Sequence, residues 1–490
     1  MSDEILINVT PSECRVAVVE SGQLQELYLE RNDDLSYCGN IYMGRVERVL
    51  PGMQAAFVHI GLDRTAFLHA SDICPRQPEL VDGEEPTPVP AISELVRQGQ
   101  KVLVQVIKDP IGTKGARLTT QLSIPSRYLV LLPEVANIGV SLRIESETER
   151  QRLRDLLLEC IGEDNASGFI LRTNAEGVQR EALVRDLDYL RRQWESIQAR
   201  MATAEPGECV YEDLALPIRA LRDLMGADID KVRVDNNRHF QRACGFAAEF
   251  LPEWLDRIEL YPGAGPLFDL YGVEDEITRA LKREVPLKSG GHLTIDQTEA
   301  MTTVDVNTGG FVGHRNLEET IYKTNLEAAQ AVARQLRLRN LGGIIIIDFI
   351  DMVEPEHRHQ VVNILKRALA RDHARTGVSD ISELGLVEMT RKRTSESLER
   401  RLCEPCPMCS GRGRIKSVDT VCSEIFREIL RAVRQFESGQ LRVLATPAVV
   451  DRILEEHHRS IAELTEQLKT SIRFQPEDHY TQEQFDVVLL

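Results

Sequence analysis

The stretch between residues 290 and 351 constrains the fold of this 490-residue chain more than any other part of it. A segment of alternating polarity at 304–307 and four consecutive isoleucines at 344–347 both have the character of strands. The isoleucines follow a double glycine and are followed by Asp348. We therefore expect a strand that is buried on both faces and whose carboxyl end places the Asp348 carboxylate at the edge of the sheet. Between these strands, apolar residues recur at roughly helical spacing: Leu317, Ile321, Ala328, Val332 and Leu336. Strand, helix and strand predict a crossover unit with parallel strands.

The polar residues of this unit predict a divalent-metal site at one edge of a sheet. The period of two in a strand places Asp305 and Asn307 on one face, and parallel strands end at the same edge, where ligands bind. Asp348 should converge with them, and Glu299 and Asp351 are candidates for supporting roles. Carboxylate and amide oxygens favour Mg²⁺ or Mn²⁺ over zinc, and such an ion promotes phosphodiester hydrolysis. The alternative interpretation is that these acids are ordinary solvated strand ends.

The overall charge of the chain opposes non-specific attraction to phosphate. The formal net charge is -18 and the pI is near 5.2, so a nucleic-acid surface must be a local concentration of Lys and Arg. Candidates for holding a phosphate backbone near the acids are Arg334, Arg337, Arg339 and residues 391–393.

The N-terminus lacks the basic and apolar segments of a signal peptide, and no stretch approaches the ~18 apolar residues of a membrane span. A cytoplasmic protein is expected. The ten cysteines therefore do not form a disulfide framework, and only three of them cluster.

Cys406 and Cys409 form a Cys-x-x-Cys knuckle followed by glycines, which is half of a structural zinc site. Zinc requires four ligands. Either Cys403 and a distant residue complete the shell, or two chains each supply Cys406 and Cys409 to a shared ion; we favour sharing, because two-fold symmetry explains the missing half. The alternatives are a reduced turn without metal and a redox pair.

The N-terminal residues 5–29 contain three short apolar stretches separated by turns, which predict a β-meander. A meander of this size buries no core alone. We expect it to pair with the mainly helical region 216–281, which has a strand at 231–234, in a two-layer discontinuous domain. At the other end, residues 417–490 alternate helix and strand, with one long helix at 449–468.

Five short strands between residues 41 and 119 predict a small barrel of the OB type, with an exposed loop at 75–90. Phe57 and Phe67 fall on strands. Cations accompany them: Arg45, Lys108, Lys114 and Arg117. Aromatic rings that stack on bases, together with cations along the backbone, suit single-stranded nucleic acid, although such aromatics are also typical of a barrel core.

Residues 125–215 have a mixed α/β pattern. Arg172 and Thr173 stand at the end of a strand, before a turn into the helix 181–201. Hydroxyl and guanidinium groups beside a helix start predict an anion pocket. The alternative is a surface arginine and a turn threonine.

Three motifs resemble the bacterial RNase E/RNase G endoribonucleases. They are GGHLTIDQTEAMTTVDVN at 290–307, RQLRLRNLGGIIIIDFID at 334–351, and the CPMC knuckle at 406–409. The resemblance covers essentially the whole chain. Because the chain stops after a small C-terminal domain, without a long disordered tail, it is more similar to the RNase G branch.

The resemblance implies a multidomain α+β fold in which an OB-fold barrel and a sensor domain are inserted into an RNase H-like subdomain. The implied segments are 1–37 and 216–281 for the RNase H-like subdomain, 38–124 for the OB fold, 125–215 for the 5′ sensor, 282–402 for a DNase I-like catalytic subdomain, 403–416 for a zinc-link and 417–490 for a small α/β C-terminal domain.

The resemblance also implies the chemistry. Asp305 and Asp348 would bind Mg²⁺, with Mn²⁺ as an alternative, and Asn307 would orient the ion. A Mg²⁺-activated water would cut single-stranded, A/U-rich RNA and leave 5′-phosphate and 3′-hydroxyl ends. Expected substrates are ribosomal RNA precursor, through maturation of the 16S 5′ end, and decaying mRNA. The competing function is a non-catalytic RNA-binding scaffold whose acids are structural.

Further residues carry over from the resemblance to binding roles. The RNA-gripping positions are Phe57, Phe67, Lys108 and Lys114. The sensor of a 5′-monophosphate consists of Arg172, Thr173, Val130, Arg143 and Arg375. Members of the family pair through a zinc ion shared between knuckles, so we expect a homodimer that can assemble further into a tetramer. Cys403 is additional to the minimal knuckle and leaves the zinc ligand set open.

Overall fold

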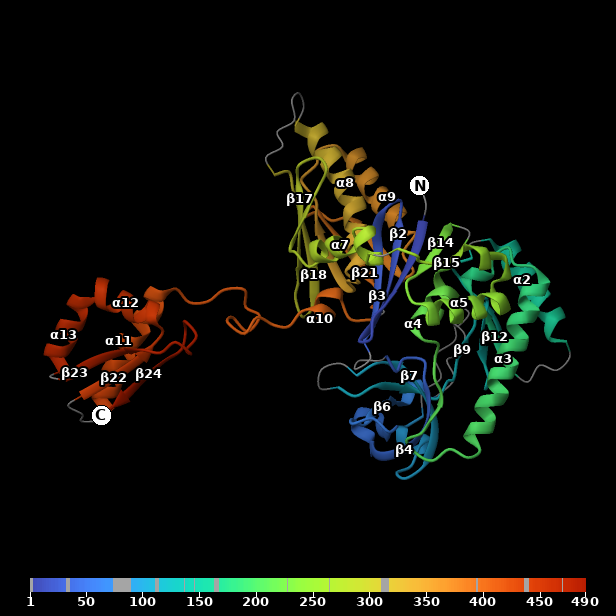
Figure 1. Cartoon of the computed structure of the whole chain (residues 1–490), viewed down its shortest axis with the longest axis horizontal. Helices are drawn as coiled ribbons and strands as arrows, with labels where there is room; N and C mark the ends of the chain where they lie inside the picture. Colours follow the sequence, from blue (N-terminus) through green and yellow to red (C-terminus); the bar gives the residue numbers. More distant parts are fainter. Residues whose placement is uncertain are drawn as a thin grey trace. The chain divides into compact units, whose positions relative to one another are not determined.

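The computed structural model describes residues 3–31, 36–73, 90–110, 114–135, 137–144, 146–162, 167–226, 228–263, 265–309, 317–393, 395–435, 440–468 and 470–490. The chain divides into two compact units, Met1–Leu398 and Glu399–Leu490 (Figure 1). Most of the loop expected at 75–90 lies outside the described residues. Among the helices of the described ranges, none is long and apolar enough to cross a membrane.

The N-terminal strands form a meander that is completed by a later segment. Strands β1 (Asp3–Val9), β2 (Glu13–Glu20) and β3 (Gln23–Arg31) are antiparallel neighbours. The turn between β2 and β3 is the pair Ser21 and Gly22, both with positive φ, which matches the twist of a tight hairpin.

Strand β14 (Ile229–Val234) pairs in parallel with β1, and β15 (Ile258–Leu260) extends the sheet beyond it. Helices α4 (Leu216–Leu224) and α5 (Asn237–Phe250) bury their apolar sides in the core of this sheet. The expected pairing of the meander with the region 216–281 is confirmed.

A closed barrel follows the meander in the sequence. The hydrogen-bonded order is β4 (Ile41–Leu50), β5 (Ala55–His59), β6 (Ala66–His69), β8 (Arg117–Thr119) and β7 (Lys101–Lys108), and β7 also pairs with β4. That last pairing closes five strands on themselves and leaves no free edge among them. Strand β13 (Cys209–Tyr211) pairs with the first residues of β4, before the part of β4 that pairs with β5. Alternate residues such as Val46, Val58 and Leu118 fill the interior.

A four-stranded sheet occupies the next region, in the order β11 (Ile138–Val140), β12 (Gly168–Leu171), β10 (Leu129–Leu132) and β9 (Ile124–Pro125). Helices α2 (Glu147–Ile161) and α3 (Arg180–Met201) share its core. The buried Asp186 of α3 accepts hydrogen bonds from the Ser126 hydroxyl and from the N–H groups of Tyr128 and Leu129. This contact fastens the helix to the beginning of β10.

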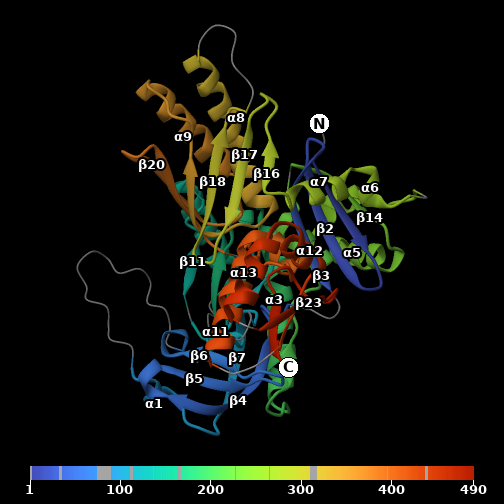
Figure 2. The same ribbon diagram turned by 90° about the vertical axis from the view of Figure 1, so that its left-hand side faces the viewer.

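The second half of the first unit contains a six-stranded sheet. Its order is β16 (Glu284–Pro286), β17 (His292–Gln297), β18 (Met301–Asn307), β19 (Gly343–Asp348), β21 (Leu386–Arg391) and β20 (Thr376–Ile381). Helices α8 (Leu317–Leu338) and α9 (Pro355–Leu369) lie together along one face (Figure 2). Strands β18 and β19 are parallel and α8 connects them, so the predicted crossover unit is confirmed.

The expectation that the isoleucine strand is buried on both faces is wrong. Ile345 and Ile347 are fully buried, whereas Ile344 is 50% exposed. The reason is that α8 and α9 cover only one face of the sheet, so alternate side chains of β19 remain on the open face.

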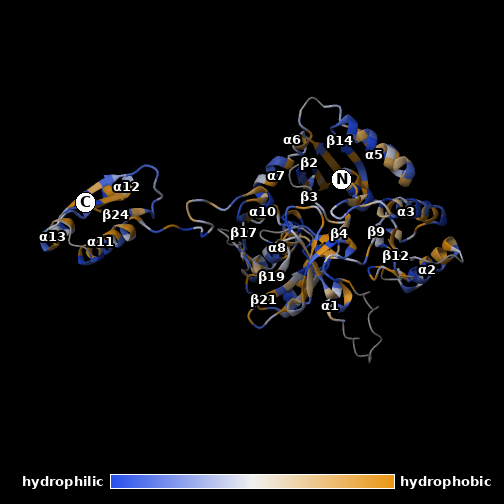
Figure 3. Ribbon diagram, turned by 90° about the horizontal axis from the view of Figure 1, so that it is seen from below, coloured by the Kyte–Doolittle hydropathy of each residue, from blue (hydrophilic) through white to orange (hydrophobic). Residues whose placement is uncertain are grey.

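The C-terminal unit has a three-stranded sheet, with β22 (Gln440–Ala445) between β23 (Ser471–Pro476) and β24 (Phe485–Leu489). Helix α11 (Val418–Gln435) packs on it, and hydrophobic residues alternate with hydrophilic ones along its length (Figure 3). The single helix predicted at 449–468 is instead two, α12 (Pro447–Glu456) and α13 (His458–Leu468). A straight helix of 20 residues would extend about 30 Å, beyond strands that span about 20 Å, and the break keeps both helices over the sheet.

Candidate active site

Two carboxylates meet at the carboxyl ends of the parallel strands. Asp305 on β18 is the register partner of Asp348 on β19, and both side chains are exposed on the open face. Asn307 follows on the same face, and its Nδ2 donates a hydrogen bond of 2.7 Å to Asp305 Oδ2. The structure therefore brings together the three residues that the alternation pattern predicted to converge.

A third acid contributes to the electrostatics of this edge. The pKa of Asp348 is raised above its usual value, first because partial burial removes some of its hydration and then because the charges of Asp305 and Asp351 repel its own. Asp351 thus has the supporting position that was expected. Glu299 does not: it lies in the turn before β18, six residues from Asp305, or about 20 Å along a strand.

The donor set fits a hard divalent cation. Within the described ranges there is no group of three or more His, Cys, Asp or Glu side chains placed to hold a metal, so Asp305 and Asp348 offer two carboxylates and leave other positions to water or substrate. Mg²⁺ commonly binds proteins in this way. The repulsion between the acids, which raises the pKa of Asp348, is the interaction that a cation would relieve.

The arginines expected to hold a phosphate backbone have structural partners instead. Arg337 is buried and donates to Glu26 at 2.9 Å and to Glu20 at 2.8 Å, which joins α8 to the N-terminal sheet. Arg391 is buried against Asp372 at 2.6 Å.

Two further members of that group, Arg334 and Arg339, behave similarly, whereas Lys392 and Arg393 are exposed. Arg334 donates to the carbonyl of Leu24 and pairs with Glu276, and Arg339 is buried and donates to Gln335. Arg334 lies in the last turns of α8 and Arg339 directly follows the helix, so both precede the beginning of β19 rather than its carboxyl end. For these four arginines the prediction was wrong, because sequence alone does not show which cations are already paired.

The barrel carries an aromatic pair on its outer surface. Phe57 and Phe67 are register partners with ring centroids 6.2 Å apart, and neither belongs to the barrel core. The register continues from Phe57 to the exposed Arg48, and from Phe67 through Arg117 to Lys108. We call these five residues the barrel band; the alternative that the phenylalanines are core residues is not supported.

Arg48 was missed by the sequence reasoning. A bulge between Val46 and Arg48 shifts the pairing of β4 with β5 by one residue, and this changes the face on which the later residues of the strand lie. Arg45 and Lys114 are also exposed, but in the described part of the barrel neither is in register with Phe57 or Phe67.

Two of the expected sensor residues, Thr173 and Arg143, make contacts near the junction of the four-stranded sheet with the six-stranded one. Thr173 and Ser141 share a hydrogen bond of 3.1 Å, and Nη2 of Arg143 donates to the carbonyl of His373 at 2.8 Å. Arg375 follows His373 by two residues and is exposed. Arg143 therefore bridges the two sheets.

Arg172 directly follows β12, and Val130 lies on β10 of the same sheet. The Arg172 guanidinium pairs with Asp223 at 2.7 Å and donates to the carbonyl of Ser126 at 2.6 Å. Val130 is half-buried on β10, opposite Ile170 of β12. Asp223 offsets part of the positive charge of Arg172, which no sequence pattern indicated.

The cysteine knuckle lies in the C-terminal unit. Cys409 is buried and its Sγ accepts a hydrogen bond of 3.3 Å from the N–H of Gly413. That bond is the main reason that the pKa of Cys409 is lowered, with a further contribution from Cys406. Cys403 and Cys406 are exposed. Two neighbouring sulfurs, one of them held in a thiolate-favouring turn, fit half of a tetrahedral zinc site.

Comparison with known proteins decides the family. The sequence profile described as "Ribonuclease E/G family" matches residues 123–394, more than half of the chain. The chain belongs to the ribonuclease E/G family. A second profile, "RNase E/G, Thioredoxin-like domain", matches residues 405–489.

Relatives within the ribonuclease E/G family match over the full length. The chain is 54% identical to Ribonuclease G of Salmonella typhimurium over 100% of both chains, and 52% identical to Ribonuclease G of Haemophilus influenzae over 99% of both. Identity to Ribonuclease E of Haemophilus influenzae is 35%, over 99% of this chain and 52% of that one. The chain is therefore a ribonuclease G-like member of the family, as its motifs and length predicted.

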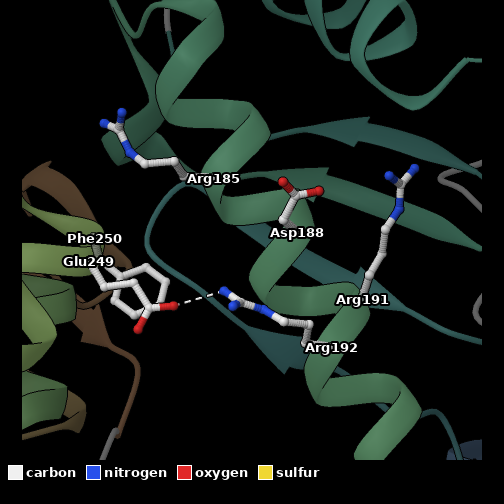
Figure 4. Close-up of a pocket in the computed structure, with 6 residues that line it drawn as sticks. All are labelled: Arg185, Asp188, Arg191, Arg192, Glu249 and Phe250. Atoms are coloured by element: carbon white, nitrogen blue, oxygen red, sulfur yellow. Dashed lines mark hydrogen bonds and ion pairs between the residues drawn. The ribbon is translucent and has the colours of Figure 1, made fainter.

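A hollow of this family member lies elsewhere in the first unit. It has a volume of about 580 Å³ between α3 and α5 and is lined by Arg185, Asp188, Arg191, Arg192, Glu249 and Phe250 (Figure 4). Arg192 pairs with Glu249 at 2.7 Å, and Arg191 points away from that pair. Because its charges nearly balance, the hollow lacks the convergent chemistry of the acid pair.

Proposed function

We propose that this chain is a metal-dependent endoribonuclease that cuts single-stranded RNA at the pair Asp305 and Asp348. As a ribonuclease G-like protein it is an endoribonuclease; the metal, the chemistry and the substrates are our proposal. The observation that carries it is the register of the two acids at the carboxyl ends of β18 and β19.

In this mechanism Asp305 and Asp348 would hold Mg²⁺, with Mn²⁺ as an alternative. When bound, the ion would supply an activated water and would neutralise charge on the scissile phosphate. Asn307 holds the Asp305 carboxylate through its 2.7 Å hydrogen bond and so limits its orientation. Both acids must be ionised for this role. Attack of this water on the phosphorus would break the P–O3′ bond, and with a proton taken up by the departing O3′ oxygen it would leave 5′-phosphate and 3′-hydroxyl ends.

The barrel would hold the substrate. Its closed five-stranded order supports an OB fold, and Phe57 and Phe67 lie side by side where bases can stack on them. Arg48, Lys108 and Lys114 would contact the phosphates. Stacking requires unpaired bases, which agrees with single-stranded, A/U-rich RNA as the substrate.

A separate phosphate-binding site, distinct from the barrel, would recognise a 5′-monophosphate on the RNA. We assign it to Thr173, Arg143 and Arg375, with Arg172 and Val130 beside them. The hydrogen bond from Arg143 to His373 supports this assignment, because it would couple occupancy of the site to the sheet that carries the acids. Cleavage would then be faster for RNA that begins with a monophosphate.

Two chains would pair through zinc. Cys406 and Cys409 supply two ligands, and the same residues of a second chain would complete a tetrahedral site. Cys403 is an alternative ligand, and dimers could associate further into tetramers. Ribosomal RNA precursor and mRNA are the substrates we propose, in the cytoplasm.

We keep the expected domain boundaries as part of the proposal. The sheet formed by β1, β2, β3 and β14 supports an RNase H-like subdomain made of 1–37 and 216–281. The sheet with its open acidic face supports a DNase I-like catalytic subdomain at 282–402. The remaining segments are the OB fold, the sensor, the zinc-link and the small C-terminal domain.

The test is cleavage of a short 5′-monophosphorylated RNA with and without EDTA. Asp305→Asn and Asp348→Asn should abolish metal-dependent cutting and retain RNA binding, whereas the control Asp380→Asn, an exposed acid on β20 of the same sheet, should cut normally. A wild-type chain that binds RNA but never cuts it would favour the scaffold function instead.

A further inference from the structure

We infer that Asn325 of helix α8 is a positioning residue for the acid pair, an inference that rests on the proposed function of Asp305 and Asp348. Asn325 is completely buried. Its Oδ1 accepts a hydrogen bond of 3.1 Å from the N–H of Ile350, and its Nδ2 donates one of 2.8 Å to the carbonyl of the same residue. One side-chain amide thus satisfies both backbone groups of Ile350.

The place of Ile350 gives this contact its importance. Strand β19 ends at Asp348, and Ile350 stands between Asp348 and Asp351. The described pairings of β19 with β18 and β21 both end at Asp348, and buried backbone groups left unpaired beyond that point would be costly. An asparagine amide has one donor end and one acceptor end and can replace both missing partners. Asn325 therefore fixes the direction in which the chain leaves β19.

The preceding residue of α8 lies beside Gly291, which in turn lies against the end of the other acid strand. Thr324 is buried, and its Cγ2 is 3.3 Å from the position that a Cβ on Gly291 would occupy. A Cβ at Gly291 would also lie 2.4 Å from the carbonyl oxygen of Asn307, so Gly291 is needed for close approach to the end of β18. Two consecutive residues of one helix thus contact the chain beside the ends of both strands.

Other polar side chains of α8 support the loops on either side. The Glu327 carboxylate accepts hydrogen bonds from the N–H groups of Lys288 and Ser289, just before β17. Glu318 accepts from the N–H of Val353, just after Asp351. The helix that connects the acid strands therefore also holds the turns around them.

The chemical consequence concerns the spacing of the two carboxylates. Asp305 and Asp348 are the last register pair of their ladder, where strands fray most readily. Catalytic ligands must be held to within about half an ångström by their supporting contacts. Asn325 supplies that support without touching substrate.

The test is Asn325→Ala, with Gln335→Ala as a matched control. Gln335 is a buried amide on the same helix that accepts a 2.7 Å hydrogen bond from Arg339, ten residues from Asn325. Both variants should lower the unfolding temperature. Only Asn325→Ala should lower kcat, by about 10-fold to 100-fold, with KM and RNA affinity in EDTA nearly unchanged. Equal kcat values for the two variants would overturn the inference.

A measurement on the metal-free wild-type chain does not depend on the folding of either variant. In hydrogen exchange, the backbone amide of Ile350 should be protected as strongly as the amides within β19. Exchange of the Ile350 amide at the rate of an open loop would contradict the inference. If Asp348→Asn still cuts RNA, the proposed function itself fails. If Asp348→Asn is inactive and Asn325→Ala keeps full kcat, only the role of Asn325 fails.

Discussion

Asp305 and Asp348 are paired residues of neighbouring parallel strands, and their carboxylates are exposed on the face of the sheet opposite to α8 and α9. Their proximity, together with Asp351, raises the pKa of Asp348 in addition to the effect of partial burial. In the absence of a cation this arrangement disfavours the charged native state. The site is therefore built for binding at the expense of stability.

Replacing Asp348 by Asn should stabilise the metal-free protein while it abolishes cleavage. A native pKa above the unfolded value of about 3.9 means that ionised Asp348 is destabilising, and that this effect disappears as the pH falls through the raised native pKa. In EDTA at neutral pH we expect an unfolding temperature about 1–2 °C higher for Asp348→Asn, with the difference shrinking in acid. Cleavage in Mg²⁺ should fall by about 100-fold or more. If Asp348→Asn unfolded at a lower temperature than the wild type in EDTA, ionised Asp348 would not be destabilising in the metal-free protein.

Arg48→Ala should weaken RNA binding through a lost phosphate contact. Arg48 is exposed and in register with Phe57 at the end of the barrel band. Removing one such contact should reduce the slope of log K against log salt by about 0.7 for a single strand. Fluorescence anisotropy of a labelled single-stranded RNA at several salt concentrations measures this slope. The control is Arg192→Ala, whose arginine pairs with Glu249 in the α3–α5 hollow; equal losses for both variants would remove Arg48 from the interface.

Arg337→Met should destabilise the first unit strongly. Arg337 and its partner Glu26 are 9% and 6% exposed, so the variant leaves a buried carboxylate without its cation. The expected loss is about 3–5 kcal/mol in the free energy of unfolding, measured by urea denaturation. The double variant Arg337→Met with Glu26→Gln should recover part of it. A single variant as stable as the wild type would mean that the pair contributes nothing.

Cys406→Ser combined with Cys409→Ser should release zinc and convert dimers to monomers. The expectation follows from the shared site, in which two chains are joined by one ion. Metal content and mass by light scattering report the two effects. Cys403→Ser is the informative comparison: retained zinc and dimers indicate two cysteines per chain, and loss of both indicates that Cys403 is a ligand. A double variant of unchanged mass would reject the zinc-mediated dimer.

Local patterns determined much of the architecture. Alternation placed Asp305 and Asn307 on one face, and helical spacing predicted α8 between β18 and β19. The tight turn at Ser21 and Gly22 followed from the same kind of rule. These features depend on backbone geometry over a few residues, which the sequence specifies directly.

Other features depend on partners that are distant in the sequence, and only the tertiary structure decided them. Arg337 is a structural residue because Glu26, 311 positions away, lies against it. Ile344 is half exposed because α8 and α9 cover a single face of the sheet. Asn325 is linked to the acid pair because the crossover returns it to Ile350. The sequence by itself indicated that Asp305, Asn307 and Asp348 converge at neighbouring strand ends, because that follows from local periodicity, and the packing of remote segments decided which arginines form buried ion pairs.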